Sequence, residues 1–232
     1  MTNLVIALDI DKNKALRIVD NLTDFINFYK IGHKLFTSNP EIINIINRKG
    51  KKVILDLKYH DIPSVVGFAI EEVIKKYAPF GLTLHISGGK KMLEQAVETK
   101  QKFNSKIQPI LFGVTVLTSL DTTDLKTIGI NVRKVSDQVI RLSKIAKECG
   151  LDGVVCSGYE IEYIKKICGK KFLTLVPGLS LDPKAHTGQK RSVTITDAIK
   201  KKADYIVVGR TIYDSEDPIK TVKEILQIKW IF

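Results

Sequence analysis

Four charged side chains stand early in this chain, within or just after apolar segments of the kind that form buried strands. Asp56 and Lys58 lie two residues apart, and Asp61 follows three residues after Lys58. Since residues i and i+2 of a strand point to the same face, Asp56 and Lys58 are predicted to project together. Lys30, in the preceding apolar segment, can join them to give two cations and two anions. Buried charges are costly unless paired or functional, so the group is either a salt bridge between core layers or a catalytic cluster.

Such a cluster suits a reaction in which negative charge develops on the substrate. A protonated lysine stabilises developing negative charge, and preorganised electrostatics of this kind is usually the largest catalytic contribution. Neighbouring carboxylates favour the charged form of an ammonium group. We therefore expect Lys58, flanked by Asp56 and Asp61, to stay protonated near neutral pH.

A second group of residues, near the C-terminus, consists of residue types that bind phosphate groups in proteins. Gly209 permits close approach of the backbone to a ligand, and Arg210 presents a fork of hydrogen-bond donors. Gly178 and Gln189, in the long aperiodic segment 178–192, can complete the phosphate cradle. The alternative for Arg210 is a surface salt bridge.

Short apolar segments alternate with amphipathic segments along the whole chain. Near-continuous apolar runs are typical of parallel strands that are buried on both faces. They predict strands at 4–8, 28–31, 53–57, 82–86, 107–116, 153–156, 172–176 and 204–208. Helical spacing of apolar residues, with Pro63 as a start signal and Gly150 as a stop signal, predicts helices at 12–26, 62–77, 132–149 and 217–230.

Eight strands separated by helices predict an α/β fold, a (β/α)8 TIM barrel. A doubly wound open sheet is the alternative. No Pro/Ser-rich linker or change in charge divides the sequence, so residues 1–232 are predicted to form one domain. The active site of a barrel lies at the C-terminal ends of its strands, which is where the charged residues fall, and 178–192 is the candidate closing loop.

The basic excess of the chain does not by itself indicate nucleic acid. Lys and Arg total 37 against 25 Asp and Glu, a net charge of +12, but 31 of the 37 are Lys and they are spread along the sequence. Phosphate clamps and groove readers favour Arg. We expect no nucleic-acid partner, although a basic nucleic-acid-binding protein remains an alternative.

Other features of the sequence bear on the cellular compartment in which the protein works. No apolar segment approaches the roughly 20 residues of a membrane-spanning helix, and the N-terminus has no signal-peptide pattern. We therefore expect a cytoplasmic protein with no membrane partner. Three cysteines without a C-x-x-C pair and four scattered histidines argue against a disulfide framework or a metal site.

Eight segments, in order along nearly the whole chain, resemble those of the orotidine 5′-phosphate decarboxylase family. The most specific is D-L-K-Y-H-D-I-P at 56–63; an isolated D-x-K-x-x-D also occurs in sister families of phosphosugar decarboxylases. The other segments are A-L-D at 7–9, Y-K-I-G at 29–32, H-I-S-G-G at 85–89, G-V-T-V-L-T-S at 113–119, P-G-L at 177–179, G-Q-K-R at 188–191 and V-V-G-R at 207–210.

The resemblance implies decarboxylation of orotidine 5′-monophosphate to uridine 5′-monophosphate (UMP), the last step of de novo pyrimidine nucleotide biosynthesis, without cofactor or metal. Lys58 would donate a proton to the pyrimidine carbon that loses carbon dioxide, Asp56 would sit beside the departing carboxylate, and Lys30 would hold the network together and contact the ribose. Asp61 and its neighbour Ile62 would reach into the partner subunit's site of a homodimer. The remaining implied substrate contacts are Asp9, Val65, Thr118, Ser180, Gln189, Gly209 and Arg210.

Three positions depart from the family pattern. Val65 stands where the family usually has Thr, Ser180 where it often has Arg, and Thr187 begins T-G-Q in place of G-D-Q. These changes bear on affinity and loop closure, not on the type of reaction. The missing arginine contact can be replaced by a nearby cation: Lys184, Lys190 or Arg191.

The main alternative activity is that of a metal-dependent phosphosugar decarboxylase of the same superfamily. That chemistry needs an acidic metal ligand near the second strand. The chain has Lys30 and His33 there, which disfavours it.

Overall fold

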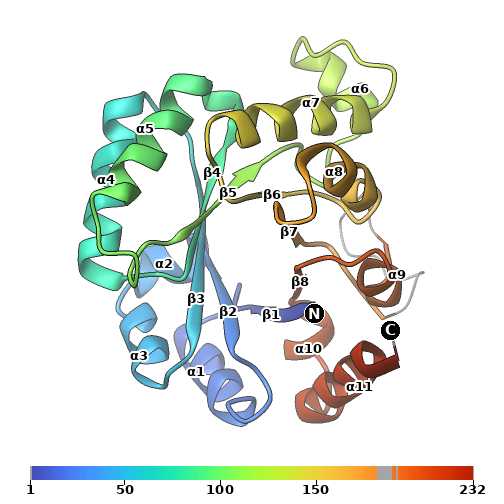
Figure 1. Cartoon of the computed structure of the whole chain (residues 1–232). Coiled ribbons are helices and arrows are strands. Elements are labelled where there is room, and N and C mark those ends of the chain that lie inside the picture. Colours follow the sequence, from blue (N-terminus) through green and yellow to red (C-terminus); the bar gives the residue numbers. More distant parts are fainter. Residues whose placement is uncertain (1, 182–189, 192, 232) are drawn as a thin grey trace.

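Eight parallel strands form a closed barrel in the computed structural model, which describes residues 2–181, 190–191 and 193–231 (Figure 1). Each strand pairs with its sequence neighbours, and β8 pairs with β1 to close the ring. This confirms the predicted (β/α)8 barrel and excludes the open sheet. The strands are β1 (Asn3–Ala7), β2 (Phe28–Gly32), β3 (Lys52–Tyr59), β4 (Gly81–His85), β5 (Ile110–Val114), β6 (Gly153–Val155), β7 (Leu173–Val176) and β8 (Tyr205–Val208).

Helices surround the strands on the outside of the barrel (Figure 1). Their starts follow local capping chemistry: the Asp11 side chain accepts a hydrogen bond from the Lys14 backbone N–H at the start of α1, and Pro63 opens α4. The helices are α1 (Lys12–Asn21), α2 (His33–Ser38), α3 (Ile42–Arg48), α4 (Pro63–Tyr77), α5 (Lys90–Gln101), α6 (Thr122–Thr127), α7 (Val135–Glu148), α8 (Ile161–Cys168), α9 (Ile195–Lys200), α10 (Arg210–Tyr213) and α11 (Pro218–Ile231), with a 3₁₀ turn η1 (Ile86–Gly88).

Two predicted elements differ most in length from the observed ones. The helix predicted at 12–26 ends at Asn21, because the chain turns there toward β2; Ile26 still packs into the core from that turn. The strand predicted at 107–116 begins only at Ile110, since Pro109 has no N–H for the ladder. No helix in the described part of the chain is long and apolar enough to cross a bilayer.

Apolar side chains fill the barrel in a way that fixes where a cavity can form. Phe28, Phe80, Phe112 and Tyr205 make edge-to-face contacts, with ring centroids 5.1–6.0 Å apart. Three of the four belong to the starts of strands or the residues just before them. The N-terminal half of the barrel is therefore closed, and open space is left at the C-terminal ends of the strands.

A partly buried ion pair ties three elements together at the N-terminal end of the barrel. Asp204, just before β8, accepts hydrogen bonds from the Lys165 ammonium of α8 (2.6 Å) and from the backbone N–H (2.7 Å) and hydroxyl (2.9 Å) of Thr174 in β7. Lys165 also donates to the carbonyl oxygens of Lys170 and Phe172. The Lys165 ammonium thus has three acceptors and Asp204 Oδ2 accepts three hydrogen bonds, which indicates a structural role for the pair.

Replacing Asp204 by Ala is expected to lower the free energy of unfolding by about 2–4 kcal/mol, because it leaves Lys165 and the Thr174 N–H without their acceptor. Glu148→Ala is the matched control: it breaks the Lys90–Glu148 pair, whose side chains are 57% and 60% exposed, and should leave the free energy of unfolding almost unchanged. Urea unfolding of both variants measures the difference. Equal effects would contradict a structural role for Asp204.

Candidate active site

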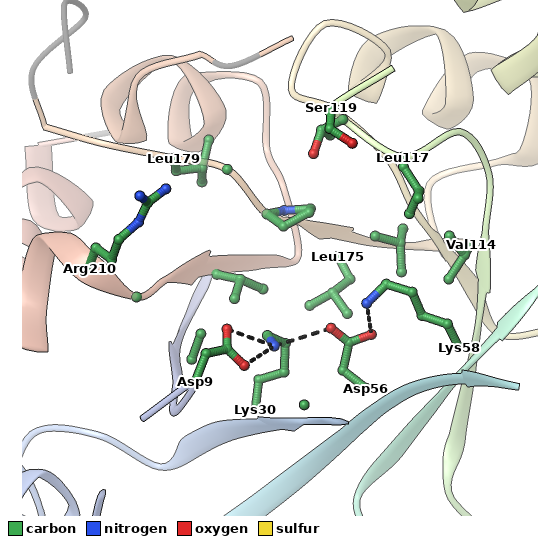
Figure 2. Close-up of a pocket in the computed structure, with 18 of the residues that line it drawn as sticks. Asp9, Lys30, Asp56, Lys58, Val114, Leu117, Ser119, Leu175, Leu179 and Arg210 are labelled. Carbon is green, nitrogen blue, oxygen red and sulfur yellow. Dashed lines mark hydrogen bonds and ion pairs between the residues drawn. The ribbon is translucent and has the colours of Figure 1, made fainter. Parts of the chain in front are cut away.

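A cavity of about 690 Å³ opens at the C-terminal ends of the strands (Figure 2). Val114, Leu117, Leu175 and Pro177 give it an apolar wall, and charged residues line its floor and far side. It brings together residues that lie far apart in the sequence. The predicted site residues among its lining are Asp9, Lys30, Asp56, Lys58, Thr118, Gly178, Gly209 and Arg210.

Four of these side chains form a row of alternating charges. The Lys30 ammonium lies 3.3 Å from Asp9 Oδ1 and 3.2 Å from Asp56 Oδ2, and the Lys58 ammonium lies 2.9 Å from Asp56 Oδ1 (Figure 2). The side chains of Lys30 and Asp56 are only 10% and 12% exposed, whereas that of Lys58 is 29% exposed. Lys58 is thus the cation of the row that faces the cavity.

The ionised state of the buried pair follows from competing effects. Burial alone would lower the pKa of Lys30, but the carboxylates of Asp56 and Asp9 outweigh it, and the pKa lies above its usual value. Burial likewise would raise the pKa of Asp56, but Lys30, Lys58 and a hydrogen bond from Thr83 hold it well below its usual range. Both groups therefore remain charged at neutral pH.

Lys58 reaches Asp56 through an irregular strand and not through simple alternation. The β3–β4 register shifts between Leu55 and Tyr59, and Lys58 has a left-handed backbone with φ of 50°. Its N–H donates to the hydroxyl oxygen of Thr83 (3.0 Å), and that hydroxyl donates to Asp56 Oδ1 (2.8 Å). Thr83 therefore holds both the strained backbone and the carboxylate.

Sequence reasoning missed Thr83, although a signal was present. A hydroxyl stands in the middle of the apolar run at 82–86, and a buried polar side chain needs a partner. The parallel pairing of β3 and β4 places that partner on the neighbouring strand.

Gly32 makes room for the start of the charged row. A Cβ at this position would lie 2.7 Å from Asp9 Oδ1, too close for any real contact. The Gly of the Y-K-I-G segment is thus needed so that Asp9 can lie against Lys30.

Arg210 lies on the opposite side of the cavity from Lys58 (Figure 2). It follows Gly209 at the end of β8, where the chain turns from strand into α10. The cavity thus has cations on both sides. This arrangement can receive a substrate that carries an anionic group at one end and develops negative charge at the other.

Several predicted site residues do not line this cavity. Asp61, Ile62 and Val65 are exposed, and Asp61 Oδ1 accepts from the Ile62 N–H at 2.7 Å. Ser180 is buried outside the lining, with its backbone paired to Thr194. Gln189 lies outside the described residues.

The cations proposed to replace the missing arginine are engaged elsewhere. Lys190 binds Asp121 (2.8 Å) and Asp124 (2.9 Å), and Arg191 binds Glu160 (2.7 Å). Neither lines the cavity, so that expectation is wrong for both; Lys184 lies outside the described residues.

The cavity offers little for a metal ion among the residues that the structure describes. His33 lines it, but Asp9 and Asp56 are both paired with lysines. Within the described ranges, no three His, Cys, Asp or Glu side chains are grouped so as to hold a metal.

Comparison with known proteins identifies the family. A model of the family described as Orotidine 5'-phosphate decarboxylase / HUMPS matches residues 2–225. The chain belongs to this family. Its relatives include an orotidine 5'-phosphate decarboxylase of Ehrlichia canis, 44% identical over 225 residues that cover 96% of each chain. The enzyme of the same name from Buchnera aphidicola is 41% identical, with 95% of this chain and 93% of the relative covered.

Solved structures of the same family agree. The orotidine 5'-phosphate decarboxylase of Lactobacillus acidophilus is similar with a TM-score of 0.84 and 30% identity, covering 99% of each chain. The orotidine 5'-monophosphate decarboxylase of Methanocaldococcus jannaschii, solved as a complex with the inhibitor BMP, has a TM-score of 0.78 at 25% identity, covering 98% of each chain. Solved members of the orotidine 5'-phosphate decarboxylase family therefore share this barrel, and one of them was solved with an inhibitor bound.

In this member of the decarboxylase family, Thr83→Val is expected to lower kcat about 10- to 100-fold with little change in KM, because a small displacement of catalytic groups has effects of this size. Thr83→Ser keeps the oxygen that bridges Lys58 and Asp56 and should stay near the wild-type rate. Steady-state kinetics of the two variants checks this. Equal rates for Val and Ser would show that the bridge does not position Lys58.

Proposed function

We propose that this chain catalyses the cofactor-free decarboxylation of orotidine 5′-monophosphate to UMP and carbon dioxide, the last step of UMP biosynthesis, with Lys58 as the proton donor. Family membership and the names of its relatives support the reaction. The observation that carries the site assignment is the row Asp9–Lys30–Asp56–Lys58 on one side of the cavity, with Arg210 on the other.

Lys58 is suited to the chemical step. Loss of carbon dioxide leaves an electron pair on a ring carbon, and the nearby ammonium stabilises that charge before transferring a proton to the carbon. The ammonium is fixed by Asp56 at 2.9 Å and is open to the cavity. In this step the bond between the ring carbon and the carboxylate breaks, and carbon dioxide leaves. The electron pair that stays on the ring carbon takes the Lys58 proton, and solvent then reprotonates the lysine.

Asp56 and Lys30 set the position and charge of Lys58. Asp56 accepts from Lys58, Lys30 and Thr83, so its carboxylate is oriented as well as ionised. In the proposed complex it lies beside the departing carboxylate of the substrate. Lys30 and Asp9 then contact the ribose, since they continue the row away from Lys58.

The phosphate is assigned to the side of the cavity formed by Gly209 and Arg210. Gly209 leaves the backbone accessible, and the Arg210 fork matches phosphate oxygens. We assign Thr118, on the opposite wall, to the base, and keep Ser180 and Gln189 as further phosphate contacts. Binding energy at the phosphate, remote from the reacting carbon, can then be used to orient the base.

Lys58→Ala is expected to reduce kcat by at least about 10³-fold, because it removes both the proton donor and the cation that stabilises the developing charge. Lys90→Ala, at an exposed pair, is the control and should keep full activity. The loss of orotidine 5′-monophosphate is followed by ultraviolet absorbance, with and without a chelator. Near-normal turnover by Lys58→Ala would contradict the role of Lys58, and chelator-sensitive wild-type activity would favour the metal-dependent alternative.

We also propose that the active form is a homodimer in which Asp61 completes the partner subunit's site. Asp61 does not line the cavity of its own chain. Beside it, Ile62, Val65 and Phe68 are 61%, 44% and 68% exposed, an apolar surface at the start of α4. Apolar groups clustered in this way are typical of a subunit interface. Ile62 and Val65 then act near the shared site.

A mixing experiment tests the shared site. Lys58→Ala and Asp61→Ala homodimers should each be nearly inactive, but a mixture that exchanges subunits should recover about a quarter of wild-type activity, because half of the dimers then contain one intact site. A mixture of Lys58→Ala with Lys30→Ala is the control: each substitution damages the site of its own subunit, so exchange of subunits restores no intact site and the mixture should stay inactive. No recovery in the Lys58→Ala and Asp61→Ala mixture would contradict a role for Asp61 across the interface. Full activity of a monomer at high dilution would contradict the homodimer.

Two broader assignments accompany this function. We propose that residues 1–232 act as one barrel domain, since β1 and β8, from the two ends of the sequence, pair with each other. We place the enzyme in the cytoplasm, where its three free and buried cysteines, Cys149, Cys156 and Cys168, would stay reduced.

A further inference from the structure

A buried ion pair behind the cavity is not used by the proposed reaction. Arg191 Nη1 lies 2.7 Å from Glu160 Oε1, and the two side chains are only 11% and 3% exposed. Glu160 Oε2 accepts from the backbone N–H of Ser157 at 3.0 Å. The pair therefore fixes Arg191 against the turn that follows β6.

From this position Arg191 holds one wall of the cavity. Its Nη2 donates to the carbonyl oxygen of Val116 (3.0 Å), and its backbone N–H donates to the carbonyl oxygen of Thr118 (3.1 Å). Both Val116 and Thr118 line the cavity. One residue thus binds two carbonyl groups of the wall formed by residues 116–119.

The same short segment is tied to two further elements. The Arg191 carbonyl oxygen accepts from the Ser157 hydroxyl at 3.0 Å. Lys190 binds Asp121 and Asp124, the pair that caps α6 directly after the wall. Residues 190–191 therefore connect the wall, the turn after β6 and the start of α6.

Stability alone is a poor reason for this arrangement. Replacing a buried ion pair by apolar residues is often neutral or stabilising. Arg191 Nε is also buried with no hydrogen-bond partner among the described residues, which is unfavourable. What the guanidinium does provide is a rigid fork that holds two acceptors at once, the Glu160 carboxylate and the Val116 carbonyl oxygen, which a lysine cannot reproduce.

We propose that Arg191 is a positioning residue for the reaction, which fixes the 116–119 wall through the carbonyl oxygens of Val116 and Thr118. The inference rests on the proposed function, in which Thr118 contacts the base.

Kinetics of Arg191 variants with orotidine 5′-monophosphate test the proposal. Arg191→Met should lower kcat/KM by about 10- to 100-fold, the effect of a small misplacement of binding groups. Arg191→Lys keeps a charge for Glu160 but loses the fork to Val116, and should fall between Met and wild type. Lys165→Met, which breaks the ion pair at the other end of the barrel, is the control: its melting temperature should fall, but kcat/KM per folded molecule should stay near wild type.

A double-mutant cycle separates positioning from a general loss of structure. When Arg191→Met is combined with Thr118→Ala, the loss of kcat/KM should be at least about fivefold smaller than the product of the two single losses, because both substitutions act on the same wall. Combining it with Asp9→Asn, on the other side of the cavity, should give the full product. Wild-type kcat/KM in Arg191→Met, or independent effects with Thr118→Ala, would overturn the proposal. A wild-type enzyme inactive on orotidine 5′-monophosphate would instead contradict the proposed function.

Discussion

The site depends on one constraint: charges buried at the mouth of the barrel must neutralise one another. Lys30 is almost fully buried and stays charged only because Asp9 and Asp56 lie within 3.3 Å of it. Asp56 in turn is ionised because Lys30 and Lys58 face it from two sides. Removing any inner member would leave an uncompensated buried charge, which is strongly unfavourable. The row is therefore fixed as a unit, and it holds Lys58 at its end, facing the cavity.

The scaffold meets this constraint through details that a regular barrel lacks. The aromatic side chains around Tyr205 close the N-terminal half, so that the charges lie in a closed-ended cavity. Gly32 gives Asp9 space, and Thr83 supports Lys58 in a left-handed backbone conformation. Such strain persists only where the surroundings over-determine it, and it is concentrated at functional sites. Of the three non-glycine residues with positive φ in the described part of the chain, Lys58, Ala78 and Lys202, only Lys58 lines the cavity, and it is the proposed proton donor.

The sequence predicted the barrel and most of the charged residues in the cavity lining, because apolar runs mark buried strands and charges within or after such runs mark the strand ends where a site can form. Lys30, Asp56 and Lys58 were predicted from that pattern, and Asp9 from the resemblance to the family. Thr83 and the true partner of Arg191 were missed because each depends on contacts between distant segments. Arg191 was one of three cations considered as a phosphate contact, but a buried Glu160, 31 residues earlier, binds it in the structure. The position of Asp61 has a different cause: its proposed role requires a second chain, which no pattern within one sequence can locate.

The two ends of the barrel use similar ion pairs for opposite purposes. At the N-terminal end, the Lys165 ammonium donates to three acceptors, Asp204 and two carbonyl oxygens, so all its hydrogens are used within the protein. At the C-terminal end, Lys58 has one acceptor among the described residues, Asp56, and its ammonium has further protons to donate into the cavity. The difference is in hydrogen-bond saturation and not in charge. It explains why a net charge of +12 says little about function, whereas a single lysine that lines the cavity and is held by an ionised carboxylate is the group on which the proposed reaction depends.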